Sequence, residues 1–297
     1  MVNGGVRMKI AIIGGSGKMG QWFAEFLSTD GKDVIIHGRD EQKLNDAGKR
    51  LNVSTTTNIL DAVKGADVVL VSVPIDSFEE VIKKLQPCLA QGQTVIDITS
   101  VKMMPVEVMH SHLPGISVLG THPVFGPGAK SARNQNFVLT PTNGAEAEIA
   151  GRVKQFLEEK GAVVTLMTPQ EHDEMMSVIL GLSHFIAIAS ADVLLSFSSL
   201  EKMKEIGGPT YKVLLTLAES VITEDPELYA SIQMNLPGMT EMEDLFRESS
   251  KKWADIVRNR DRQGFIERMN RIKERLPDIS PEFGSSYREM YDLLDEK

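Results

Sequence analysis

The chain has 297 residues, of which 42% are hydrophobic and 25% are charged, and its formal net charge is −9. These proportions are close to the globular average and exclude a disordered or collagen-like chain. The acidic balance lacks the basic surface of a nucleic-acid binder, and no signal sequence is visible, so we expect neither a nucleic-acid nor a membrane partner. The single cysteine, Cys88, permits no intrachain disulfide, which fits a cytoplasmic protein.

Short apolar runs alternate with helical patterns in the first half of the chain. The runs predict strands at residues 9–13, 33–37, 66–73, 94–98, 117–120 and 162–166. Apolar strands separated by amphipathic helices are typical of a mainly parallel sheet covered on both faces, so residues 8–166 are predicted to form a Rossmann-like α/β dinucleotide-binding domain. After Pro169 only helical patterns appear. We expect an all-α substrate and dimerisation domain over residues 167–280 and a C-terminal tail over residues 281–297.

One helical segment, residues 175–197, is apolar enough to resemble a membrane span. It contains His184 and Asp192, and a central aspartate would cost about 2.5–3.5 kcal/mol in a bilayer. We therefore expect this helix to be buried on all sides, either in a protein core or in a subunit interface.

Residues 15–20, GSGKMG, match the pattern G-x-G-x-x-G directly after the first predicted strand and at the start of a helix. In this context Gly15 is expected to allow the tight turn, Gly17 the close approach of a pyrophosphate, and Gly20 the close packing of helix on strand. The alternative is that the glycines serve only the turn. The residues expected to contact the dinucleotide are Gly15, Ser16, Gly17, Lys18, Met19, Gly20, Arg39, Val73 and Pro74.

The end of the second strand bears on which dinucleotide is bound. NAD enzymes usually place an acidic residue here to bond the ribose hydroxyls. The chain instead has Gly38 at that position, followed by Arg39, which could pair with a 2′-phosphate. This favours NADP, whereas Asp40 in the acidic role would favour NAD.

Two polar segments follow later strands, at the edge where open α/β sheets bind ligands: DITSVK at residues 97–102 and GTHPVFGP at residues 120–127. His122 would sit on a rigid loop and suits a general base near neutral pH, although it could instead cap backbone groups. Ser100 and Lys102 could orient a substrate hydroxyl and bind an anion. No pair of histidines has the spacing of a zinc site, so we expect no metal.

The segments GGSGKMG, DITSVK, GTHPVFGP, EHDEMM and DPELYASIQM, in this order, resemble the prephenate dehydrogenases of tyrosine biosynthesis. The resemblance covers residues 8–276 and is similar above all to the dehydrogenase portion of the fused chorismate mutase–prephenate dehydrogenases. Since no mutase segment is visible, we expect a monofunctional enzyme. The resemblance implies NAD(P)-dependent oxidative decarboxylation of prephenate to 4-hydroxyphenylpyruvate by a homodimer formed through the helical domain.

The resemblance also implies roles for individual residues. His122 matches the catalytic histidine that accepts the hydrogen bond or proton of the C4 hydroxyl. Ser100 matches the serine that helps to hold this hydroxyl, and Lys102 matches a lysine linked to catalysis or carboxylate binding.

One position departs from the family pattern. Members usually carry an arginine five residues before the Asp-Pro pair, where this chain has Ser220. Cations that could replace it are Lys102, Lys130, Arg133 and Lys212, and His172 is a further candidate for substrate binding. The departure leaves an arogenate dehydrogenase or a non-catalytic dinucleotide-binding homologue as alternatives. A β-hydroxyacid dehydrogenase is disfavoured because residues 172–181 offer no lysine as acid or base.

Overall fold

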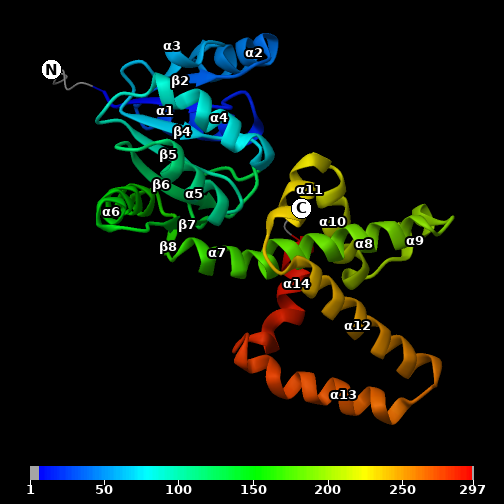
Figure 1. Ribbon diagram of the computed structural model, residues 1–297. Coiled ribbons are helices and arrows are strands. Elements are labelled where there is room, and N and C mark those ends of the chain that lie inside the picture. The colour runs from blue at the N-terminus through cyan, green and yellow to red at the C-terminus, as the bar shows by residue number, and fades with distance from the viewer. Residues whose placement is uncertain (1–6, 296–297) are drawn as a thin grey trace. The chain divides into compact units, whose positions relative to one another are not determined.

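The chain divides into two compact units, one up to Met176 and the other from Ser177. The computed structural model (Figure 1) describes residues 7–295, and their side chains up to residue 292. The first unit thus extends ten residues beyond residue 166, where the first domain is expected to end. Helix α7 (Pro169–Met176) belongs to the first unit because its Asp173 accepts backbone N–H groups from Lys102 and Met103.

The first unit contains an eight-stranded sheet in the order β3-β2-β1-β4-β5-β6-β7-β8. Its strands are β1 (Lys9–Ile13), β2 (Asp33–His37), β3 (Ser54–Thr56), β4 (Val68–Val71), β5 (Thr94–Asp97), β6 (Ser117–Pro123), β7 (Asn136–Thr140) and β8 (Val163–Leu166). All neighbouring strands are parallel except β6 and β7, which confirms the predicted mainly parallel sheet. Strands β3 and β7 were not predicted: β3 has only three polar residues, and β7 forms the antiparallel pair with β6.

Helices cover both faces of this sheet. They are α1 (Lys18–Thr29), α2 (Glu41–Leu51), α3 (Ile59–Val63), α4 (Phe78–Leu85), α5 (Met103–His112) and α6 (Gly144–Glu159). One apolar cluster packs α1, α2 and α6 against the sheet, and a second packs α3, α4 and α5. Because strand side chains alternate between faces, Ile10 and Ile12 of β1 belong to the first cluster, while Ala11 and Ile13 belong to the second.

A cavity of about 400 Å³ lies on the face covered by α1 and α6. Helix α1 contacts β1 and β2, and α6 contacts β6, β7 and β8, so the central strands β4 and β5 are left less covered on this side. The cavity is lined mainly by apolar side chains such as Leu70 and Ile96, and no residue of the glycine loop lines it. Ile98 and Thr121, at the carboxyl ends of β5 and β6, do line it.

The second unit is helical. It begins with a π-helical turn, η3 (Ser177–Leu182), and continues with α8 (Ser183–Leu195), α9 (Leu200–Ile206), α10 (Pro209–Ile222), α11 (Pro226–Asn235), α12 (Met239–Arg258), α13 (Arg262–Arg275), η4 (Leu276–Asp278), η5 (Phe283–Ser285) and α14 (Ser286–Asp295). No strand occurs between residues 177 and 295, which confirms the predicted all-α domain. The expected tail contains α14, which contacts α10; residues 296–297 lie outside the described part.

The segment that resembles a membrane span lies in a helix, Pro169–Leu195, with a mean hydropathy of 2.0, long and apolar enough to cross a membrane. Only 11% of its apolar window is buried. Val193 and Leu195 of α8 are 62% and 70% exposed. Burial inside the core of a single chain is therefore wrong for this helix, and a subunit interface remains the prediction.

Candidate functional site

The turn between β1 and α1 forms a tight backbone loop. The left-handed residue in this turn is Gly14, with φ +83°. A Cβ on Gly15 would come within 2.5 Å of the Ile36 Cβ, and one on Gly20 within 2.5 Å of the Gly14 carbonyl oxygen. The absent side chains thus let α1 pack closely on the turn at Gly20 and let β2 approach the turn at Gly15.

The N-terminus of α1 is shaped to receive an anion. Gly17 occupies the N-cap, and no side chain caps the helix there. Uncapped backbone N–H groups and the helix dipole favour a phosphate at this point. Lys18 and Met19 form the first turn, and Val73, at the end of β4, lies beside Gly14. The loop thus has the chemistry that a dinucleotide pyrophosphate requires.

The end of β2 lies against this glycine loop. The carbonyl oxygen of His37 accepts the N–H groups of Gly14 and Gly15 at 3.0 and 2.9 Å. A Cβ on Gly38 would come within 2.6 Å of Ser16 Oγ, so a larger residue there would have to displace this hydroxyl.

Arg39 and Asp40, the next two residues, are exposed but differ in their contacts. The Asp40 carboxylate accepts the Lys43 N–H at 3.0 Å and so caps α2. The Arg39 guanidinium makes no hydrogen bond or ion pair with any residue between 7 and 295.

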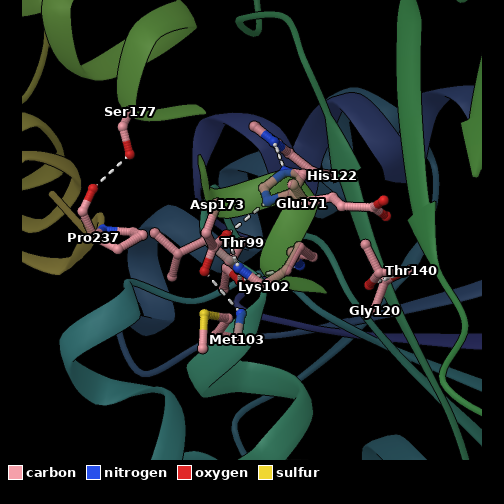
Figure 2. Close-up of polar contacts among 12 residues, drawn as sticks. Thr99, Lys102, Met103, Gly120, His122, Thr140, Glu171, Asp173, Ser177 and Pro237 are labelled. Carbon is pink, nitrogen blue, oxygen red and sulfur yellow. Dashed lines mark hydrogen bonds and ion pairs between the residues drawn. The ribbon is translucent and has the colours of Figure 1, made fainter. Parts of the chain in front are cut away.

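Lys102 is fully buried, and its ammonium is surrounded by oxygen atoms of β5 and β6 (Figure 2). Its Nζ donates to the Asp97 carboxylate, to the Thr121 carbonyl oxygen at 2.5 Å and to the Thr99 hydroxyl at 3.3 Å. An ammonium group has three donors, so these partners occupy all of them. Lys102 therefore lies next to His122 in space, as expected, but has no donor left for a substrate carboxylate.

His122 lies within β6, opposite Val138 of β7, and not on a loop as expected. The side chain is 3% exposed, and its Nδ1 lies 2.8 Å from His172 Nε2. No residue that the structure describes bonds to His122 Nε2. Ser100 follows β5 at the same edge of the sheet, is half-buried, and has a hydroxyl without a partner among the described residues. Ser100 and His122 thus lie at the carboxyl ends of the neighbouring strands β5 and β6.

Burial controls protonation in this part of the unit. It lowers the pKa of His122 well below the ordinary 6.5, and positive charge on His172 or Lys102 lowers it further. Burial also lowers the pKa of His172, although the Asp173 carboxylate opposes this shift. For the Lys102 ammonium, burial lowers the pKa against the opposing charges of Asp97 and Asp173. His122 is consequently neutral at pH 7 and able to accept a proton.

The other predicted substrate-binding residues have different surroundings. His172 is fully buried, with both ring nitrogens engaged, because Nδ1 lies 2.7 Å from Asp173 Oδ1. Lys130 is exposed in the loop after β6, and Lys212 is exposed on α10 of the helical unit. Ser220, also on α10, donates its hydroxyl to the Leu217 carbonyl oxygen at 2.9 Å.

Sequence analysis missed the partners that surround these residues. Asp97, Thr99 and Thr121 hold Lys102, and Asp173 holds His172. The one signal available was an acidic residue at the end of an otherwise apolar strand, which Asp97 provides. Among residues 7–295 no group of three or more potential metal ligands is present.

Two family models match the chain. The model described as prephenate dehydrogenase, nucleotide-binding domain, matches residues 23–166, and the one described as prephenate dehydrogenase, dimerization domain, matches residues 168–271. The first match begins after the glycine loop.

Individual relatives agree with these models. A protein of Methanocaldococcus jannaschii named probable arogenate/prephenate dehydrogenase is 36% identical over 265 residues, covering 88% of this chain. A T-protein of Haemophilus influenzae is 29% identical over 283 residues, covering 95% of this chain. The chain spans 59% of the length of the first relative and 71% of the second.

Solved structures share the fold. Prephenate dehydrogenase from Aquifex aeolicus, in complex with hydroxyphenyl propionate and NAD+, has a TM-score of 0.75 at 24% identity, covering 94% of this chain and 100% of that one. Arogenate dehydrogenase from Synechocystis has a TM-score of 0.69 at 21% identity, covering 92% and 100%. With both family models matched in order along one chain, the protein belongs to the prephenate dehydrogenase family.

Proposed function

We propose that the protein is an NAD(P)-dependent prephenate dehydrogenase, which converts prephenate to 4-hydroxyphenylpyruvate and CO2 in tyrosine biosynthesis. The observation that carries this proposal is the buried, neutral His122 at the carboxyl edge of the sheet, whose Nε2 has no partner among residues 7–295. Family membership supplies the reaction, and the glycine loop supplies a fitting place for the dinucleotide.

The two free polar groups have complementary tasks in this reaction. When bound, the nicotinamide would accept the hydride that leaves C4 of the substrate. His122 Nε2 takes the proton of the C4 hydroxyl as the carbonyl forms, and the Ser100 hydroxyl holds the same oxygen. Burial of His122 keeps water from competing for this proton. Loss of CO2 from C1 then completes an aromatic ring, which makes the conversion irreversible.

Binding of the substrate carboxylates is assigned to exposed cations. Lys130 follows the strand of His122, and Lys212 lies on α10. Arogenate is the second candidate substrate because Ser220 offers no cation at the position of the family's usual arginine, and its hydroxyl bonds within α10.

NADP is the preferred dinucleotide in this proposal. Gly38 leaves no side chain to bond the ribose hydroxyls, and Asp40 is engaged in capping α2. Arg39, between them, is exposed and forms no hydrogen bond or salt bridge within the described part of the chain, although its charge contributes to lowering the pKa of Glu80. A guanidinium in this position suits a 2′-phosphate.

A cytoplasmic homodimer is the proposed assembly. Exposure of the apolar residues of α8, including Val193 and Leu195, to water is unfavourable, and a second subunit would bury them. The family model that matches this part of the chain is a dimerization domain.

Turnover assays test the reaction directly. Purified protein is combined with prephenate or arogenate, each with NADP or NAD, while reduced nicotinamide and 4-hydroxyphenylpyruvate are measured. We expect turnover of prephenate with NADP. Turnover of arogenate alone would reassign the substrate, and absence of turnover with both, despite dinucleotide binding, would favour a non-catalytic homologue.

Replacing the base should abolish most of the activity. His122→Asn is expected to lower kcat about 10²–10⁴-fold, because general base catalysis contributes this much, while NADP binding is retained. In the wild type, the pKa of His122 lies well below 6.5, so the neutral ring that the reaction requires persists at pH 6.5. Activity should therefore be retained at pH 6.5 and decline at lower pH, as His122 becomes protonated. Near-normal kcat in the variant would remove His122 from the mechanism.

Arg39→Ala tests the choice of dinucleotide. Loss of a charged hydrogen bond costs about 1.5–3 kcal/mol, so the Kd for NADP should rise about 10–100-fold while that for NAD stays within about twofold. Lys43→Ala, on the same helix start, is the matched control. Equal weakening of both nucleotides, or of neither, would contradict an Arg39–phosphate contact.

We assign Lys102 a positioning role, since it ties β5 to the residue before His122. Lys102→Met leaves the Asp97 charge buried and unpaired, so it should lower the free energy of unfolding by about 3–5 kcal/mol. Asp97→Asn/Lys102→Met removes that charge and should recover much of this loss in urea unfolding. A single variant as stable as wild type would refute the role.

A further inference from the structure

Three buried side chains form a continuous chain that begins at His122. His122 Nδ1 lies 2.8 Å from His172 Nε2, and His172 Nδ1 lies 2.7 Å from Asp173 Oδ1. All three residues are at most 3% exposed. The two rings meet edge to face, with an interplanar angle of 72°. Each link is therefore a hydrogen bond shielded from water, which makes its direction decisive for the protonation of both rings.

The direction is set at the Asp173 end (Figure 2). Asp173 Oδ1 accepts the Lys102 N–H at 2.7 Å, and Oδ2 accepts the Met103 N–H at 2.9 Å. These N–H groups lie at the start of α5, where the N-cap residue Lys102 makes no capping bond with its own side chain. The Asp173 carboxylate therefore sits at the positive end of the helix dipole. An ionised carboxylate only accepts hydrogen bonds, so the proton in the link to His172 must be on His172 Nδ1.

The position of the proton on His172 also determines the position of the proton on His122. A neutral histidine has one donor nitrogen and one acceptor nitrogen, so His172 with a proton on Nδ1 accepts at Nε2. His122 must then carry its proton on Nδ1, which leaves the lone pair on Nε2. Free histidine favours the opposite form, with the proton on Nε2. That form would point a donor, rather than an acceptor, at a substrate hydroxyl.

We infer that Asp173 and His172 form a relay that holds His122 with its lone pair on Nε2 and shares the positive charge when His122 accepts a proton. The catalytic consequence of this relay rests on the proposed function. Which ring nitrogen of His122 carries the proton, in contrast, is a property of the protein without substrate. His172, expected to bind substrate, is thereby a positioning residue.

Proton transfer through this relay balances as follows. The O–H bond of the substrate breaks, and an N–H bond forms at His122 Nε2. The proton on His122 Nδ1 can pass to His172 Nε2, while His172 keeps the proton on Nδ1. The charge then lies next to the Asp173 carboxylate, which favours it, whereas burial and the Lys102 ammonium, itself paired with Asp97, oppose it. Asp173 remains ionised throughout.

Two substitutions of His172 separate the tasks of the relay. His172→Gln provides a side-chain oxygen that can still accept the His122 Nδ1–H but cannot take a proton. His172→Phe removes the acceptor and retains the ring volume. His112→Gln, on the exposed side of α5, serves as the control because its contact is to the exposed Glu79.

The first readout is the ring form of His122 in the full chain, measured by ¹⁵N NMR of histidine-labelled protein without substrate. The His122 signals are assigned by their loss in His122→Gln. We expect a proton on Nδ1 and a bare Nε2 in the wild type, in His172→Gln and in His112→Gln. In His172→Phe the other form should appear. A proton on Nε2 in the wild type, or an unchanged ring form in folded His172→Phe, would overturn the inference.

The second readout is the rate with the substrate identified by the turnover assays. We expect kcat to fall about 10-fold in His172→Gln and at least about 100-fold in His172→Phe, with KM and NADP affinity unchanged, since general base catalysis is what is lost. Equal loss in both variants would contradict the separate role of the acceptor. An inactive wild type with the expected ring form would reject the proposed function and leave the ring assignment standing.

Discussion

The buried contacts of Lys102 are the constraint on which the site depends. Its ammonium ties the Asp97 carboxylate at the end of β5 to the Thr121 carbonyl oxygen in β6, one residue before His122. Its backbone N–H also donates to the Asp173 carboxylate of α7. Desolvating a charge costs several kcal/mol unless each donor is satisfied, so the surroundings of Lys102 tolerate little movement. The ion pair of Lys102 and Asp97 thus fixes the end of β6 that carries His122.

Asp173 explains why α7 belongs with the sheet although the helical pattern of the sequence assigns it to the second domain. Its carboxylate caps α5 and orients His172 at the same time. The Asp173 side chain therefore has two roles. It accepts the N–H groups at the start of α5, and it sets the direction of the hydrogen bonds that lead to His122. Losing either task would disturb the other.

In the dinucleotide loop, it is the absence of side chains at the glycines that shapes the site. Gly20 allows α1 to approach the turn, and Gly38 leaves room for Ser16 at the end of β2. Gly38 also offers no side chain that could bond a ribose hydroxyl, which is why the proposed function gives the neighbouring Arg39 the contact with a 2′-phosphate.

The sequence alone determined the order of elements, the parallel sheet, the glycine loop and the candidates His122 and Ser100, because these follow from local periodicity and short motifs. It could not determine the place of Lys102 or His172, since both residue types suit a ligand as well as a buried partner. Only the tertiary structure brings Asp97, Thr121 and Asp173 to them, across up to 71 positions of the chain. It also put His122 in a strand, because pairing with the antiparallel strand β7 extends β6 to Pro123. Contacts between distant segments leave no periodic trace, and in this protein they decide which polar groups remain free to react.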